Sequence, residues 1–312
     1  MRLLRPLPLL RVLTLTFSIG AAALPMHNAR AAGGDLFVTS DASNMLRTYN
    51  GNSGAYQGVF STSTTPNGQM AVHFGATNNR VLIGHNAFGV EERNATTGAL
   101  IKIYNPSGGW QWAAIYAPTG EVYIGDMQTN DVRAYDATTG AFIRMVTPIY
   151  GPADMQIGPD GNLYICSFYG GFVLIVDAIT GAFIDQIVLP GTGIANDVAF
   201  HPINGAIYVT DMATNKGYRF HPVTHALTGT FVGTSWARPH GLAFSPSTGH
   251  LLAVDGVTGQ VHEFNPNTLV ELNPAFLVPA PGDKIVDLAF QPAEQPTPAT
   301  RSTWGRIKNL YH

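Results

Sequence analysis

The sequence predicts an all-β protein, a six-bladed β-propeller with four antiparallel strands in each blade. Three observations predict it: a repeat of 41–45 residues, four short strand-like segments in each repeat, and 34 Gly with 21 Pro among 312 residues. A repeat of this length with four strands is typical of propeller blades. The Gly and Pro content favours a fold with many tight turns.

The clearest repeat spans residues 194–231, where apolar and polar residues alternate and many side chains are β-branched or aromatic. Gly, Pro and Asn separate four segments, as expected for antiparallel strands joined by turns. The predicted strands are Asp197–Phe200, Ala206–Asp211, Gly217–Phe220 and Ala226–Phe231. One such unit cannot bury both of its faces alone, and the chain contains five related units.

The second strand of the unit has the most regular pattern. It recurs at 34–40, 79–85, 120–126, 161–167, 205–211 and 249–255. An aromatic residue or leucine holds the same place each time, with spacings of 45, 41, 41, 44 and 44, at Phe37, Leu82, Tyr123, Tyr164, Tyr208 and Leu252. The turn after the third strand also recurs, at 50–54, 94–98, 136–140 and 177–181, and in weaker form at 221–225 and 265–269.

The two ends of the repeat region predict how the ring closes. Six first strands are present but displaced by one unit, at Met70–Phe74, Ala113–Tyr116, Asp154–Ile157, Asp197–Phe200, Gly241–Phe244 and Asp287–Phe290. The earliest second strand has no first strand before it, and the last first strand has nothing after it. We therefore expect residues 284–291 to pair with the N-terminal blade, which removes an exposed sheet edge. The propeller spans 34–291.

The N-terminal segment predicts export. Arg2, Arg5 and Arg11 precede an apolar run at 12–24, and Ala29-Arg30-Ala31 is an A-x-A cleavage pattern. These are the features of a bacterial-type secretory signal peptide at 1–31, so we expect a secreted, periplasmic or cell-surface protein. The apolar run is too short for a spanning helix, and no later segment reaches about 18 apolar residues, which predicts no membrane span.

The charge of the mature chain excludes one class of partner. Removal of residues 1–31 takes away four Arg and no acid, so the formal net charge changes from −3 to −3 − 4 = −7. Nucleic-acid binding needs a basic surface, and we expect no nucleic-acid partner. The single cysteine, Cys166, lies on a predicted strand and is expected to be a buried apolar residue. We expect a monomer.

The C-terminal residues differ in composition from the repeats. Residues 292–300 form a Pro-rich linker, and 301–312 form a short tail with three basic and several large apolar residues. The tail is either mobile or docked on the propeller, or it is a recognition tag for export or surface attachment.

Acidic residues recur where the first strands enter the central channel. Asp154, Asp197 and Asp287 share one position, and Asn196 and His240 share the position before it. Three interpretations stay open. The carboxylates accept backbone N–H bonds from the neighbouring blade, or Asp154, Asn196, Asp197 and Asp287 bind Ca²⁺ or Mg²⁺, or Asp197 acts as a general base beside His240.

Aromatic residues gather in the loops that lead into the first strands. Such side chains present rigid apolar surface with a polar group, which suits stacking on sugar rings or packing on a peptide. For Trp110 and Trp236 the alternative is packing between blades. The predicted ligand-binding residues are Trp110, Trp112, Tyr150, Tyr169, Trp236, Arg238 and His85.

The repeats resemble the NHL and YVTN families of extracytoplasmic bacterial propellers. The similar segments are 129–132, the turn at 136–140, 163–165 and 207–211, and the resemblance covers residues 34–291. It implies a propeller that binds a carbohydrate, peptide or protein through its loop face, since the fold itself does not define an activity. A more distant similarity to gluconolactonase/regucalcin-like propellers implies the alternative, a metal-dependent hydrolase or lyase of lactonase type.

Overall fold

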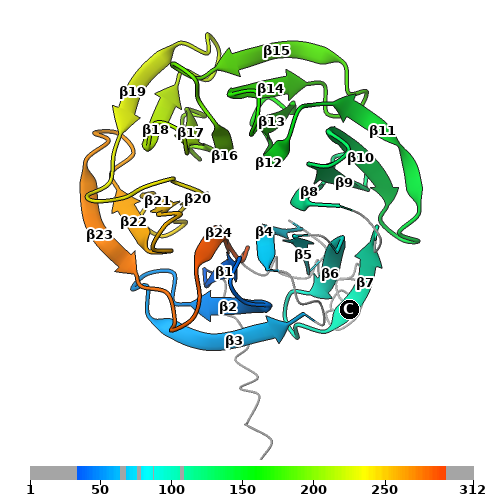
Figure 1. Ribbon diagram of the computed structural model, residues 1–312, viewed down its shortest axis with the longest axis horizontal. Coiled ribbons are helices and arrows are strands. Elements are labelled where there is room, and N and C mark those ends of the chain that lie inside the picture. The colour runs from blue at the N-terminus through cyan, green and yellow to red at the C-terminus, as the bar shows by residue number, and fades with distance from the viewer. Residues whose placement is uncertain (1–33, 64–67, 76–78, 87, 106–108, 293–312) are drawn as a thin grey trace, which may run out of the picture.

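The computed structural model describes residues 34–63, 68–75, 79–86, 88–105 and 109–292. The predicted signal peptide, most of the predicted linker and the predicted tail lie outside these residues. The described residues form 24 strands in six four-stranded antiparallel sheets around one axis (Figure 1). The predicted six-bladed β-propeller is therefore confirmed.

Each blade begins with the strand nearest the channel. Blade 1 contains β24 (Ile285–Phe290), β1 (Leu36–Ser40), β2 (Met45–Tyr49) and β3 (Tyr56–Thr62). Blade 2 contains β4 (Gln69–Phe74), β5 (Arg80–His85), β6 (Val90–Asn94) and β7 (Leu100–Tyr104). Blade 3 contains β8 (Gln111–Tyr116), β9 (Glu121–Asp126), β10 (Asp131–Asp136) and β11 (Phe142–Pro148).

The second half of the ring repeats this arrangement. Blade 4 contains β12 (Pro152–Ile157), β13 (Leu163–Ser167), β14 (Phe172–Val176) and β15 (Phe183–Val188). Blade 5 contains β16 (Ala195–Phe200), β17 (Ile207–Asp211), β18 (Lys216–Phe220) and β19 (Leu227–Phe231). Blade 6 contains β20 (Leu242–Phe244), β21 (Leu251–Val254), β22 (Val261–Phe264) and β23 (Glu271–Leu277).

The ring closes in blade 1 as the sequence predicts. Strand β24 pairs antiparallel with β1, from Leu36 opposite Phe290 to Ser40 opposite Ile285. The last strand of the propeller therefore forms the inner edge of the blade that begins it, as Figure 1 shows by the red strand beside the blue ones.

The repeated aromatic or leucine position of the second strand forms the core between blades. All six of these side chains are fully buried. Where the residue is tyrosine, its hydroxyl can reach the next blade: Tyr123 donates to the Ala178 carbonyl at 2.8 Å, and Tyr208 donates to the Pro266 carbonyl at 2.7 Å. Because these two carbonyls lie in turns, the tyrosines fix the turn of one blade against the sheet of another.

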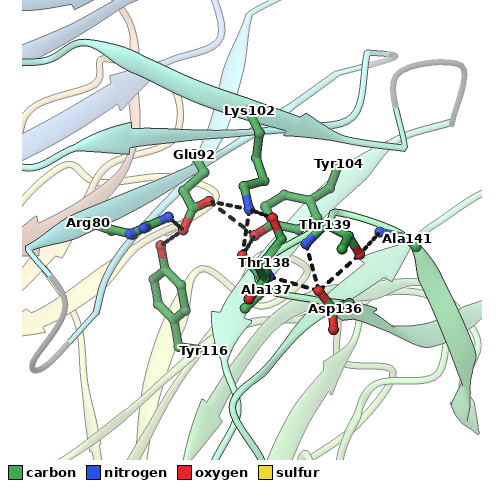
Figure 2. Close-up of polar contacts among 10 residues, drawn as sticks. All are labelled: Arg80, Glu92, Lys102, Tyr104, Tyr116, Asp136, Ala137, Thr138, Thr139 and Ala141. Atoms are coloured by element: carbon green, nitrogen blue, oxygen red, sulfur yellow. Dashed lines mark hydrogen bonds and ion pairs between the residues drawn. The ribbon is translucent and has the colours of Figure 1, made fainter.

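A buried carboxylate also joins blades 2 and 3. Glu92 lies between Arg80 at 3.1 Å and Lys102 at 3.6 Å, and it accepts hydrogen bonds from the hydroxyls of Tyr104 and Tyr116 (Figure 2). Lys102 also donates to the carbonyls of residues 137 and 138 in the turn of blade 3. Burial and the charge of Glu92 raise the pKa of Tyr116, so this hydroxyl remains a donor at any ordinary pH.

Candidate functional site

One end of the central channel holds a small cavity where the inner strands begin. It is lined by Met70, Trp112, Ala153, Asp154, Asn196, Asp197, His240, Val286 and Asp287. These are residues of the two sequence positions at which acidic and polar side chains were predicted to converge. The structure thus brings Asp154, Asn196, Asp197, His240 and Asp287 together in one place.

β-Bulges direct these residues into the cavity. In β16 the ladder pairs Ala195 with Asp211 and then Val198 with Val209, so Asn196 and Asp197 together lie opposite one residue. Register shifts occur at the matching place in β4, β8, β12 and β24. An extra residue at a bulge changes the direction of the side chains around it. Residues of both sequence positions therefore line the cavity, although regular strands would point neighbours to opposite faces.

The three carboxylates hold the inner strands together. Asp287 Oδ2 accepts from the Val72 N–H at 2.8 Å, and Asp154 Oδ2 accepts from the Val198 N–H at 3.2 Å. Asp197 accepts from the N–H of Leu242 in the same way. Each carboxylate therefore bonds to the inner strand of the next blade, which is the structural arrangement that the sequence left as one of three interpretations.

Burial changes the protonation of this cluster. It raises the pKa of Asp154 to about 6. Burial and then the charge of Asp154 raise the pKa of Asp287 to about 8. The pKa of Asp197 is raised well above its usual value by burial and by the charges of both other carboxylates. Because close carboxylates cannot all ionise together, the cluster retains protons at neutral pH.

His240, one of the two predicted catalytic residues, is poorly matched to base catalysis. Burial, then the positive charges of Lys284 and Arg238, lower the pKa of His240 to about 4. A general base is most effective when its pKa lies near the working pH. At pH 7 the His240 imidazole is thus a weak base.

The cavity has little room for a substrate. Its empty volume is about 280 Å³ when the space open to solvent is included, but the centre of a water molecule can occupy only about 20 Å³. Roughly 10–15 Å³ by this measure holds one water molecule. Among the described residues, no three His, Cys, Asp or Glu side chains are arranged to hold one metal ion. The Ca²⁺ or Mg²⁺ site at these residues therefore stays a prediction.

A continuous series of aromatic rings extends from the cavity across blades 3 and 4. We call Trp110, Trp112, Phe168, Tyr169 and Tyr150 the aromatic surface. Successive ring centroids lie 6.3, 5.5, 5.2 and 4.8 Å apart. Trp110, Tyr169 and Tyr150 are 39%, 46% and 58% exposed. The surface therefore presents three accessible rings supported by two half-buried ones.

Hydrogen bonds and close packing keep this surface in place. The Trp112 indole N–H donates to Asn86 Oδ1 at 3.1 Å, and the Trp110 backbone pairs with that of Asn86. The Ser167 hydroxyl donates to the Tyr150 carbonyl at 2.6 Å. Gly151 has a φ of +68°, and a Cβ there would lie 2.5 Å from the Tyr169 ring. Asn86, which sequence reasoning missed, directly follows the second strand of blade 2.

Three predicted ligand-binding residues are not part of the aromatic surface, and two of them, Trp236 and His85, are buried. Trp236 is only 5% exposed, because it packs on Phe231 and Phe264 and its indole N–H donates to the Asn215 carbonyl at 3.0 Å. The packing alternative is thus correct for Trp236, whereas Trp110 is exposed. His85 is fully buried, with Nε2 3.8 Å from Glu91 Oε2, so it presents no accessible ring to a ligand at this surface.

Arg238 keeps an exposed side chain near the cavity. Its backbone N–H donates to Asn215 Oδ1 at 2.7 Å, and its φ is +51°. Its charge acts on His240, so the guanidinium belongs to the electrostatic surroundings of the cavity.

Comparisons with known proteins identify the fold. No protein family and no curated protein matches the sequence. A chain in a crystal structure of a nidogen/laminin complex is similar in structure, with a TM-score of 0.72 and 12% identity over 84% of this chain and 99% of that chain. A virginiamycin B lyase from Staphylococcus aureus has a TM-score of 0.62 and 16% identity over 84% and 87% of the two chains.

A third similar structure is a protein of unknown function from Bacteroides caccae. Its TM-score is 0.61, with 14% identity over 82% of this chain and 98% of that one. Identities this low show a shared fold alone, and the fold does not define an activity.

Within the described ranges there is no helix long and apolar enough to cross a membrane.

Proposed function

We propose that this protein is an exported binding module of the NHL/YVTN-like type, whose aromatic surface binds a carbohydrate, peptide or protein. The observation that carries the proposal is the series of ring contacts from Trp110 to Tyr150, with three accessible rings beside the channel mouth. Tyr and Trp are enriched at binding interfaces because each buries a large rigid area and keeps a polar group.

The rigidity of the surface favours binding. Trp112 is fixed by Asn86, and Tyr169 lies against Gly151, so few rotamers would be lost when a ligand covers these rings. Ordering a mobile side chain at an interface costs about 0.5–1.5 kcal/mol. A surface that is ordered in advance avoids much of this cost.

The alternative is a metal-dependent hydrolase or lyase of lactonase type at the cavity. The convergence of Asp154, Asp197 and Asp287 favours it. Against it stand the space for about one water molecule, the carboxylate bonds to the next inner strand, and the low pKa of His240. We therefore prefer the binding function.

Arrays of glycans and a displayed library of peptides test the proposal. The variants are Trp110→Ala with Tyr150→Ala, and Phe142→Ala as the control. Phe142 is 58% exposed, as Tyr150 is, but lies on the outer strand β11 away from the channel. We expect the double variant to lose at least tenfold in affinity for the selected probe, while Phe142→Ala binds as the parent does.

The two probe sets also distinguish the ligand classes. Selection from the glycan array alone indicates a carbohydrate, and selection from the peptide library alone indicates a peptide or protein. The proposal is wrong if neither set yields a probe, or if every probe binds equally to the parent and the double variant.

A further inference from the structure

A groove crosses the seam between blades 1 and 6 on the face opposite the cavity. Strands β20 and β24 begin beside the cavity and end at Phe244 and Phe290, which both line this groove. Its walls include Asp35, Asn52, Phe244, Pro246, Phe290 and Pro292. The centre of a water molecule can occupy about 540 Å³ of it. Ligand pockets typically enclose about 300–1000 Å³.

Much of the groove wall is apolar and accessible. The rings of Phe244 and Phe290 are partly exposed, and Pro246 and Pro292 are exposed. A single polar contact, from the Ser247 hydroxyl to Asn52 Oδ1 at 2.5 Å, joins the two facing turns. Covering these apolar groups would remove them from water, which is favourable in proportion to the area covered.

A segment with several apolar residues follows the groove residues in the sequence. Pro292, the last residue that the structure describes, lines the groove. Residues 301–312 contain four large apolar side chains and three basic ones: Trp304, Ile307, Leu310 and Tyr311, with Arg301, Arg306 and Lys308. Eight linker residues, 293–300, can span up to roughly 26 Å, which is enough for the segment to turn back onto the groove.

Tethering makes even weak docking effective. A short linker whose length matches the span gives an effective concentration on the order of 1 mM. A segment that would bind as a separate peptide with a dissociation constant of about 1 mM would then occupy the groove about half of the time. The three basic residues of the segment are also complementary to the acidic mature chain.

We propose that residues 301–312 dock in this groove, with Trp304 as the apolar anchor. The docked segment covers Phe244 of blade 6 and Phe290 of blade 1, the two blades between which the ring closes. It thereby stabilises the closure that the pairing of β24 with β1 begins. This inference does not depend on the aromatic surface, which lies over blades 3 and 4.

Disulfide trapping tests the proposal on the chain from residue 32 onward. One protein carries Ser247→Cys with Thr303→Cys, which joins the groove to the segment. The control carries Thr97→Cys with Thr303→Cys. Thr97 is exposed in the turn of blade 2, and Gln291 Nε2 donates to Ala95 of that turn at 2.9 Å, so the control position also lies near the place where the linker begins. The native Cys166 is buried and does not interfere.

We expect the intramolecular disulfide between residues 247 and 303 to form at least tenfold faster than that between residues 97 and 303. Adding Trp304→Ala should slow the 247–303 disulfide to the rate of the 97–303 disulfide. Equal rates in the two pairs would overturn the proposal. So would a fast reaction at residue 247 that Trp304→Ala leaves unchanged. Predominantly intermolecular disulfides would assign the groove to a second copy of the chain instead.

Discussion

The Asp287 carboxylate accepts a hydrogen bond of 2.8 Å from the backbone N–H of Val72. This contact joins the strand that closes blade 1 to the inner strand of blade 2, although the two residues are 215 positions apart. Asp154 bonds to Val198 in the same manner between blades 4 and 5. The acidic residues at the channel mouth therefore connect neighbouring blades, whatever else they do.

The first prediction concerns pH. Unfolded Asp ionises near pH 3.9, whereas the pKa of Asp287 is about 8 and that of Asp197 is also raised. Between these values the folded protein binds more protons than the unfolded chain, so the free energy of unfolding falls as pH rises. We expect a lower thermal unfolding midpoint at pH 9 than at pH 7, a window above the titration of unfolded histidine.

Two variants test whether the Asp287 carboxyl group causes this loss of stability. Asp287→Asn should reduce the difference between pH 7 and pH 9, because its side chain no longer titrates. Asp177→Asn should leave the difference unchanged. Hydrogen bonds from the N–H and hydroxyl of residue 180, and from the N–H of residue 179, lower the pKa of Asp177. This carboxylate therefore stays ionised between pH 7 and pH 9. A midpoint that rises between pH 7 and pH 9 would contradict the prediction.

The second prediction concerns Gly241, which occupies in blade 6 the position of Asp287 in blade 1. A Cβ at Gly241 would lie 2.8 Å from Asp287 Cα and 2.9 Å from its Oδ1. Backbone atoms cannot move away easily, and overpacking typically costs about 1–3 kcal/mol. We expect Gly241→Ala to be destabilised by this amount in denaturant unfolding. An unchanged midpoint would show that the backbone at Asp287 can shift to make room for the added Cβ, which would contradict the prediction.

The third prediction compares two tryptophans. Trp236→Ala should lose about 3–5 kcal/mol of stability, as for large buried aromatic side chains, because Trp236 is buried among Phe231, Phe264 and His262. Trp110→Ala should change stability by at most about 0.5 kcal/mol, as for most surface substitutions. Urea unfolding of both proteins measures the difference. Equal losses would place Trp110 in the core and remove it from the aromatic surface.

The fourth prediction concerns the Glu92 cluster of Figure 2. Glu92→Gln leaves Arg80 and Lys102 without a buried counter-charge. Both cations are partly accessible to water, so we expect a loss of about 1–3 kcal/mol, below the 3–5 kcal/mol of a fully buried broken pair. Tyr116→Phe removes one hydrogen bond and should cost about 1 kcal/mol. If the two variants lose the same stability, the charge of Glu92 contributes nothing.

The fifth prediction tests the cavity with cations. We expect EDTA, and then excess Ca²⁺, Mg²⁺ or Mn²⁺, to leave the thermal unfolding midpoint unchanged. A cation bound at 100 times its dissociation constant would add about 2.7 kcal/mol to the free energy of unfolding. A rise in the midpoint that disappears in Asp197→Asn, but persists in Asp177→Asn, would instead support the lactonase-type alternative.

Much of the fold could be predicted because it depends on local periodicity. The spacing of the second strands gives the number of blades, and the unpaired segments at 34–40 and 284–291 give the closure. The convergence of Asp154, Asp197 and Asp287 followed from the same alignment, since equivalent positions of a ring meet near its axis. The roles of these carboxylates did not follow, because a sequence does not show which backbone groups lie within hydrogen-bonding distance.

Tertiary contacts decided which aromatic residues are accessible. Trp110 and Trp236 both lie in loops that lead into inner strands and look alike in the sequence. Trp236 is enclosed by the phenylalanines of blades 5 and 6, whereas Trp110 stacks on Trp112 and remains exposed. His85 shows the same limit, because its burial depends on how blade 2 packs around it.

The sequence by itself determined the number of blades, the place of closure and the set of residues at the channel mouth, because these follow from a repeat that every unit shares. Only the tertiary structure decided the direction and surroundings of each side chain. The β-bulges at the starts of the inner strands turn Asn196 and Asp197 together into the cavity. The packing between blades leaves Trp110, Tyr150 and Tyr169 accessible and buries Trp236. Both effects depend on contacts between distant segments, which no local pattern records.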